Sequence, residues 1–188
     1  MKFNQVMRTV DVHINSKNAK RKYVVVMRGL PGSGKSHFIR TTIPYSVAVS
    51  ADDFFVTDGK YQFDITKLNL AHKACLRNFD KLLNKQLLGT NTLVVDNTGT
   101  TVVEIAPYVQ LALAHGHSVI IATILERPET AHAQNTHGVP LVAIQAMHKR
   151  MQPFYDELPP WWNTEELVLA EKAIDGEWNI VTPVDWLE

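Results

Sequence analysis

One eight-residue segment constrains the fold of this chain more than any other part of its sequence. Residues 29–36 read Gly-Leu-Pro-Gly-Ser-Gly-Lys-Ser and fit the pattern G-x-x-x-x-G-K-[ST]. The glycines leave backbone N–H groups free to surround an anion, because no Cβ atom stands in the way. Lys35 supplies a compact positive charge, and the Ser36 hydroxyl is the kind of oxygen ligand that Mg²⁺ prefers. The segment therefore predicts a phosphate-binding loop that takes ATP or another nucleoside triphosphate together with Mg²⁺.

The residues on both sides of this loop fit the same interpretation. Residues 23–27, Tyr-Val-Val-Val-Met, are typical of a short buried parallel strand. Residues 36–40 can begin a helix whose N-terminus directs its dipole at the same phosphates. The residues expected to bind the nucleotide here are Gly29, Pro31, Gly32, Ser33, Gly34, Lys35 and Ser36.

Further strands alternate with helices along the rest of the chain. Apolar runs predict strands over residues 46–50, 92–96 and 117–125, and an apolar step of three and four residues predicts a helix over 68–83. Further helices are predicted from Thr101 to His115, from Pro140 to Met151 and over 164–172, and a last strand over 177–181. The alternation predicts an α/β fold of three layers, in which a parallel sheet of four to five strands carries helices on both faces.

The length of 188 residues suits a single domain, which we divide into three parts. Residues 1–22 are an N-terminal extension with a candidate edge strand, residues 23–152 are the core that carries the phosphate loop, and residues 153–188 are a tail packed on the core. The oligomeric state stays open.

Composition limits the partners and the cellular compartment expected for the protein. The formal net charge is zero, which argues against a broad electrostatic grip on nucleic acid but leaves room for a local basic groove. The single cysteine, Cys75, cannot form an internal disulfide, and no stretch approaches 18 apolar residues. These features predict an intracellular protein, cytoplasmic or nuclear, without a membrane partner, and the spacing of its histidines indicates no metal site.

Acidic residues follow two of the predicted strands. Asp52 and Asp53 come after the strand at 46–50, and Asp96 ends the strand at 92–96. Because ligands bind beyond the carboxyl ends of parallel strands, we expect these side chains near the phosphate loop. Asp52 is the candidate general base for an acceptor hydroxyl, with a helix-capping or turn role as the alternative. Asp96 could bind Mg²⁺ or cap the next helix, and the sequence favours neither.

Four blocks in order resemble the 5′-hydroxyl polynucleotide kinases with a phosphate loop. This family includes the kinase domain of the phage enzyme and animal ubiquitin-ligase-binding relatives that carry a kinase-like domain. The blocks are residues 28–36; residues 50–55 with 59–64; residues 94–98 with 107–109; and residues 137–141. Together they span about residues 23–152. The resemblance implies a three-layer P-loop kinase fold for this core, with a short lid around residues 127–138.

The resemblance implies a role for individual residues. Lys35 and Ser36 match the pair that binds ATP and magnesium, and Asp52 matches the base that deprotonates a 5′-hydroxyl. Asp96 and Asn97 match the block at the end of the third strand. The implied acceptor is the 5′-hydroxyl end of DNA or RNA.

Two positions depart from the family pattern. The lid usually carries Arg-Asn, whereas this chain has Gln134 before the asparagine; the phage enzyme has an arginine where Phe55 stands. Gln134 is still expected to contact the nucleotide from the lid. A guanidinium offers a charge and a two-pronged donor that glutamine and phenylalanine lack. We hypothesise that Arg127 supplies the missing charge in catalysis, with Lys149 and Arg150 as other candidates.

Three functions remain open at this point. The first is an ATP- and Mg²⁺-dependent kinase for polynucleotide 5′-hydroxyl ends. The second is a kinase for a small alcohol, such as a nucleoside or a sugar, on the same fold. The third is a nucleotide-binding module with weak catalysis, for which the glutamine in the lid is the signature.

Overall fold

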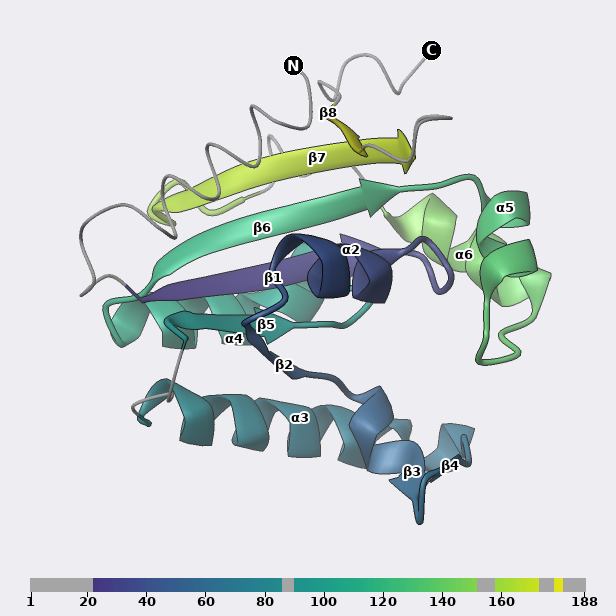
Figure 1. Cartoon of the computed structure of the whole chain (residues 1–188), viewed down its shortest axis with the longest axis horizontal. Coiled ribbons are helices and arrows are strands. Elements are labelled where there is room, and N and C mark those ends of the chain that lie inside the picture. Colours follow the sequence, from purple (N-terminus) through teal and green to yellow (C-terminus); the bar gives the residue numbers. More distant parts are fainter. Residues whose placement is uncertain (1–21, 86–89, 152–157, 173–177, 181–188) are drawn as a thin grey trace.

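The computed structural model describes residues 22–85, 90–151, 158–172 and 178–180, so the edge strand predicted within residues 1–22 lies outside it. A six-stranded sheet forms the centre, in the order β2-β5-β1-β6-β7-β8 (Figure 1). The strands are β1 (Tyr23–Gly29), β2 (Val47–Val49), β5 (Thr92–Val95), β6 (Ser118–Leu125), β7 (Thr164–Lys172) and β8 (Trp178–Ile180). The first five in this order, β2 to β7, pair in parallel, as the alternating sequence predicts, and β8 pairs antiparallel to β7.

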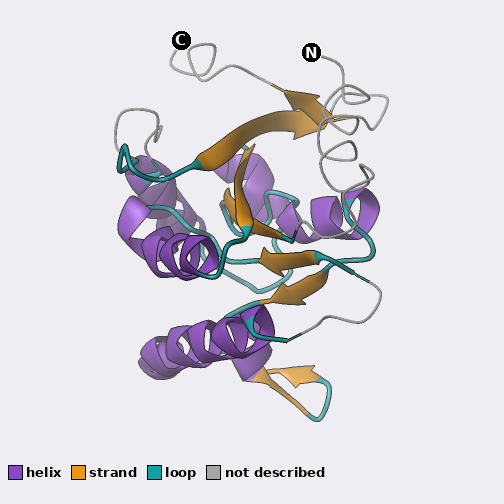
Figure 2. Ribbon diagram, turned by 90° about the vertical axis from the view of Figure 1, so that its left-hand side faces the viewer, coloured by secondary structure: helices purple, strands orange, loops and turns teal. Residues whose placement is uncertain are grey.

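Helices cover both faces of this sheet, which gives the predicted three layers (Figures 1 and 2). The α-helices are α2 (Lys35–Thr42), α3 (Leu68–Leu83), α4 (Val102–Ala114), α5 (Pro128–Gln134) and α6 (Leu141–Arg150). Side chains alternate along β1, so Val24 and Val26 pack with α3 and α4, whereas Val25 and Met27 pack with α2. Because all seven residues of β1 are buried, this strand is fixed from both sides, and the loop that follows it starts from a rigid support.

The long helix α3 follows its predicted apolar stripe. Its buried residues Ala71, Cys75, Phe79 and Leu83 lie three or four positions apart and join the core on the α4 side of the sheet. Burial also raises the pKa of the Cys75 thiol, which agrees with the role of a small core residue.

The region after Pro153 corrects one prediction. Residues 164–172 form the strand β7 and not a helix, because β7 pairs with β6 through seven residue pairs, from Val119↔Thr164 to Leu125↔Ala170. Glutamate, leucine, alanine and lysine are good helix formers, but intrinsic propensity is weaker than tertiary contacts, and the ladder to β6 overrides it. The strand β8 falls within the range predicted for the last strand. The five parallel strands agree with the four to five expected, and β8 adds an antiparallel strand at the edge of the sheet.

A short hairpin lies between β2 and α3. After the 3₁₀ turn η1 (Asp52–Phe55), β3 (Val56–Thr57) pairs with β4 (Lys60–Tyr61). Asp58 and Gly59 between them both have positive φ, 50° and 74°, as a tight two-residue hairpin turn requires. The turn η2 (Ile65–Lys67) then leads into α3. The hairpin brings Tyr61 back beside the start of η1.

The helices α5 and α6 pack against the phosphate loop. Leu30 of the loop forms a small buried cluster with Ala131 of α5 and Ile144 of α6. Gly32, with φ of 83°, approaches the backbone of Ala131 so closely that a Cβ atom would collide with it. The segment expected to act as a lid thus rests on the loop. No helix among the described residues is long and apolar enough to cross a membrane.

Candidate functional site

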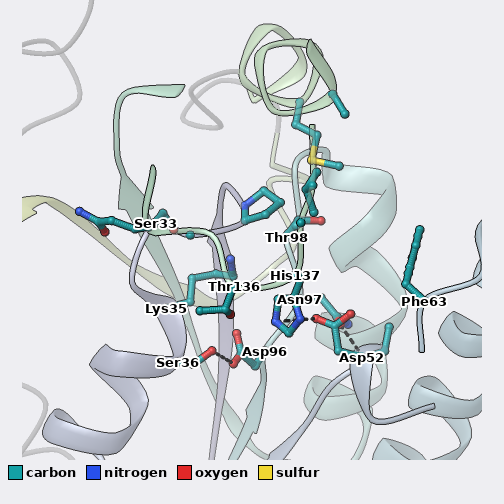
Figure 3. Close-up of a pocket in the computed structure, with 18 of the residues that line it drawn as sticks. Ser33, Lys35, Ser36, Asp52, Phe63, Asp96, Asn97, Thr98, Thr136 and His137 are labelled. Atoms are coloured by element: carbon teal, nitrogen blue, oxygen red, sulfur yellow. Dashed lines mark hydrogen bonds and ion pairs between the residues drawn. The ribbon is translucent and has the colours of Figure 1, made fainter. Parts of the chain in front are cut away.

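A cavity of about 910 Å³ opens at the carboxyl ends of the central strands (Figure 3). The phosphate loop after β1, the turn η1 after β2 and the residues after β5 all contribute to its walls, and the segment between α5 and α6 closes another side. This is where open parallel sheets bind ligands. All the predicted nucleotide-binding residues except Gly29 line this cavity, as do Asp52 and Asp96.

The phosphate loop is shaped before any ligand is added. Gly34 has a left-handed φ of 95° at the start of α2, and the ammonium group of Lys35 donates to the carbonyl oxygens of Gly29 and Leu30 at 3.0 and 2.9 Å. The hydroxyl of Ser33 is buried and has no hydrogen-bond partner. A buried hydroxyl without a partner is costly, and a phosphate oxygen would satisfy it. The loop therefore fits an anion.

The charge of Lys35 is held in a buried position. Burial lowers the pKa of its ammonium group, and the negative charges of Asp96 and Asp52 raise it in part. Both carboxylates are thus close enough to Lys35 to act on its charge. A phosphate bound beside Lys35 would therefore have one positive charge and two negative charges nearby.

Ser36 and Asp96 fit a magnesium ion. The Ser36 hydroxyl donates to Asp96 Oδ2 at 2.7 Å, which places two hard oxygen atoms side by side next to the loop. Among the described residues no three histidine, cysteine or acidic side chains cluster into an all-protein metal site. Such a pair suits Mg²⁺, which usually takes one or two protein ligands and completes its shell with phosphates and waters.

The helix-capping alternative for Asp96 finds no support. The residue that caps α4 is Thr101, whose side chain accepts from the backbone N–H of Glu104. Asn97, next to Asp96, accepts at Oδ1 from the backbone N–H of Ala51 at 2.9 Å. This bond ties the end of β5 to the start of η1 and so fixes the position of Asp52.

The neighbouring residues Asp52 and Asp53 make different contacts. Asp53 Oδ2 accepts from the backbone N–H of Ser50 at 3.0 Å, which is a turn-stabilising bond, and Asp53 does not line the cavity. Asp52 does line it, and its Oδ1 accepts from the hydroxyl of Tyr61 at 3.0 Å. Its other oxygen, Oδ2, faces His137 Nε2 at 4.0 Å (Figure 3). Asp52 is therefore the carboxylate available to a ligand.

The positions that depart from the family pattern differ in their surroundings. Phe55 is 4% exposed and packs against the rings of Phe54, Tyr61 and Phe63, so its side chain serves the core and does not face a ligand. Gln134, at the end of α5, is exposed and lines the cavity.

The candidate replacement cations also differ. Arg127, Lys149 and Arg150 are exposed and do not line the cavity, so the role of Arg127 stays a prediction. Arg40 does line the cavity, from the helix that the phosphate loop begins. Sequence reasoning missed Arg40, although its spacing of four residues from Ser36 places both on one face of α2.

Sequence reasoning also missed Tyr61 and His137 as parts of the site. Burial and the nearby charge of Asp52 raise the pKa of the Tyr61 phenol, which keeps it protonated as a donor. Its ring lies against that of His137, with centroids 4.6 Å apart. The Asp58-Gly59 turn was the available signal for Tyr61; no local pattern indicated the contact with His137.

Comparisons with known proteins identify the family and the fold of this chain. Residues 24–154 match the family model described as "AAA domain". The chain is 33% identical over 138 residues to NEDD4-binding protein 2 of Homo sapiens, covering 70% of this chain and 8% of that protein. It is 27% identical over 122 residues to the putative bifunctional polynucleotide phosphatase/kinase of Acanthamoeba polyphaga mimivirus, covering 64% of this chain and 25% of that one. The chain thus spans a small part of each relative.

A solved structure shows the same fold at low identity. Chaetomium thermophilum Kti12, in complex with ADP-AlF3, superposes with a TM-score of 0.54 at 12% identity, over 81% of this chain and 92% of that one. Together these matches confirm the fold and the resemblance to polynucleotide kinase-like proteins.

Proposed function

The chain belongs to the AAA domain family, and from this premise we propose that it is an ATP- and Mg²⁺-dependent kinase that transfers the γ-phosphate to the 5′-hydroxyl end of DNA or RNA. One observation carries the proposal. Asp52 and the phosphate-loop lysine, Lys35, line a single cavity of about 910 Å³, which has room for a nucleotide and an acceptor, and the charge of Asp52 raises the pKa of that lysine. The polynucleotide kinase-like relatives favour a nucleic-acid end as the acceptor.

Each residue then has a defined part in the transfer. Lys35 leaves the carbonyl oxygens of Gly29 and Leu30 to contact the β- and γ-phosphates, and the loop N–H groups hold the other phosphate oxygens. The acceptor oxygen forms a bond to the γ-phosphorus while the bond to the β–γ bridging oxygen breaks, and ADP carries away that electron pair. The proton of the acceptor hydroxyl passes to Asp52.

Magnesium would be held by Ser36 and Asp96, and it would add positive charge beside the phosphates. The remaining requirement is a cation near the transferred group. We place Arg40 and Gln134 as contacts to the phosphates, since both line the cavity. Arg127 remains the alternative that the sequence suggests.

A small alcohol is a second candidate acceptor, favoured by the wall of the cavity. Phe63, Ile65 and Leu68 form an apolar surface on the Asp52 side, and among the described lining residues only Lys35 and Arg40 are lysine or arginine. A polynucleotide groove usually tracks the backbone with several cations. Weak catalysis is a third candidate, favoured by the neutral side chain of Gln134 at the lid.

One assay separates these functions. The protein is incubated with γ-labelled ATP and Mg²⁺ and offered 5′-hydroxyl oligonucleotides, mononucleosides or sugars, with Lys35→Ala and Asp52→Asn as controls. Label on oligonucleotides supports the proposal, and label on small alcohols alone supports the second candidate. ATP binding without transfer to any acceptor contradicts both and supports the third.

A further inference from the structure

The carboxylate of Asp52 is engaged from two sides by residues that the phosphate loop does not supply. Tyr61 donates to Oδ1 at 3.0 Å, so this oxygen already has a partner. Oδ2 faces His137 Nε2 across a separation of 4.0 Å, which is too long for a hydrogen bond. The side chains of Asp52 and His137 are 50% and 40% exposed, so a ligand in the cavity can reach both.

The gap between these two atoms fits one hydroxyl group. An oxygen that donates to Oδ2 at about 2.6 Å and accepts from Nε2 at about 2.8 Å completes the 4.0 Å separation with an angle of about 95° at that oxygen. This angle is about 15° below the tetrahedral value, a deviation that hydrogen bonds to a hydroxyl oxygen tolerate. An ammonium or a carboxylate fits less well, because the first only donates and the second only accepts.

Hydrogen bonds of Asn135 and a ring contact with Tyr61 fix the position of His137. Asn135 Oδ1 accepts from the backbone N–H of His137 at 3.0 Å, and Asn135 Nδ2 donates to the carbonyl oxygen of Val139 at 3.1 Å. The imidazole ring lies tilted against the ring of Tyr61, with centroids 4.6 Å apart. The loop and the ring contact together direct the imidazole toward Asp52 (Figure 3).

We propose that His137 and Asp52 form a two-point site for the acceptor hydroxyl. The Nε2–H of His137 donates to the acceptor oxygen, and Asp52 Oδ2 accepts its proton. A hydroxyl oxygen has two lone pairs, so one remains to attack the γ-phosphorus. The inference rests on the proposed function, since it names the residue that orients the attacking hydroxyl, and His137 reaches it from the segment that also packs on the phosphate loop.

The test compares two ligands on four proteins. The ligands are an oligonucleotide with a 5′-hydroxyl end and the same oligonucleotide with a 5′-deoxy end, which has hydrogen in place of that hydroxyl. The proteins are the wild type, His137→Phe, His137→Gln and the matched control His132→Phe. His137→Phe keeps a ring against Tyr61 but removes the donor, and His137→Gln offers an amide donor of similar reach. His132 lies on the same lid segment, is exposed and does not line the cavity.

We expect the wild type to bind the 5′-hydroxyl end about tenfold more tightly than the 5′-deoxy end, because two hydrogen bonds to the hydroxyl are lost. His137→Phe reduces this preference to about threefold or less and lowers kcat/KM for transfer about tenfold, while affinity for ATP stays unchanged. His137→Gln recovers part of both, and His132→Phe matches the wild type.

The inference is overturned if His137→Phe keeps the full preference for the hydroxyl, or if it weakens both ligands equally, which would indicate lid packing alone. These outcomes differ from failure of the proposed function. Suppose that the wild type transfers no phosphate but prefers the 5′-hydroxyl end, and that His137→Phe loses this preference. The hydroxyl-binding site is then supported, and the proposed kinase activity is contradicted. A wild type that neither transfers phosphate nor distinguishes the two ends contradicts both.

Discussion

The phosphate loop and the acceptor side of the cavity differ in how their side chains are held. Ser33 and Lys35 are 3% and 8% exposed, and the loop grows from a strand that is buried throughout. On the acceptor side, the side chains of Asp52 and His137 are 50% and 40% exposed and come from a short turn and a loop. Phe63 there is 51% exposed. The phosphate-loop side, which we call the donor half, is largely buried. The side around Asp52 and His137, which we call the acceptor half, is open and formed by short elements.

The donor half is a general feature of the fold, whereas the acceptor half depends on residues particular to this chain. A buried strand followed by a glycine-rich turn and a helix places phosphates in the same way for many acceptors. The acceptor half depends on contacts between distant residues, such as Tyr61 with Asp52 and Asp52 with His137. Substitutions in the donor half should therefore weaken ATP binding. Substitutions in the acceptor half should slow phosphate transfer while ATP still binds.

The largest effect is expected from Lys35→Ala. This change removes the cation that we propose contacts the phosphates, so we expect turnover to fall at least about 10³-fold. ATP with Mg²⁺ should also lose most of its stabilising effect on thermal unfolding. Turnover is measured with labelled ATP and stability by a melting scan with and without nucleotide. An unchanged ATP-induced shift in Tm would mean that the phosphates bind elsewhere.

A smaller effect, of a different kind, is expected from Asp52→Asn. The amide keeps the size of the carboxylate but cannot take the proton of the acceptor, so we expect turnover to fall at least about 10²-fold. The ATP-induced shift in Tm should stay at the wild-type value, since the phosphate loop is untouched. Loss of ATP binding in this variant would contradict the separation of the two halves, and normal turnover would move the base elsewhere, first to Asp53.

Two arginine variants test which cation replaces the arginine that the lid lacks. We expect Arg40→Ala to lower kcat about tenfold, because Arg40 lines the cavity on the same helix face as Ser36. Arg127→Ala tests the sequence-based hypothesis for an exposed residue outside the cavity. If Arg127→Ala leaves turnover within about twofold of wild type, that hypothesis is removed. A larger loss from Arg127→Ala than from Arg40→Ala would instead indicate that the lid moves to bring Arg127 in.

The same contrast explains how much the sequence could reveal. The phosphate loop and the strand before it follow from local patterns, because residues 23–36 carry their whole signal within a few positions. The strand at 164–172 could not be recognised locally, since its composition favours a helix and only pairing with β6 decides it. The approach of His137 to Asp52 joins residues 85 positions apart and depends on the lid resting on the loop. Long-range contacts of this kind have no local signature.

The smallest effect is expected from Tyr61→Phe, and it tests whether the acceptor half works as a unit. The change removes the hydroxyl that donates to Asp52 Oδ1 but keeps the ring that packs against His137 and Phe55. Without that bond Asp52 can turn away from the acceptor, so we expect kcat/KM for the acceptor to fall about threefold to tenfold with no change for ATP. Steady-state kinetics with each substrate varied in turn measure this split. In Asp52→Asn the added Tyr61→Phe change should have almost no further effect, because Tyr61 acts through the carboxylate that the first change has already removed. Additive losses in the double variant would show that Tyr61 acts independently of Asp52, and the acceptor half would then consist of separate contacts.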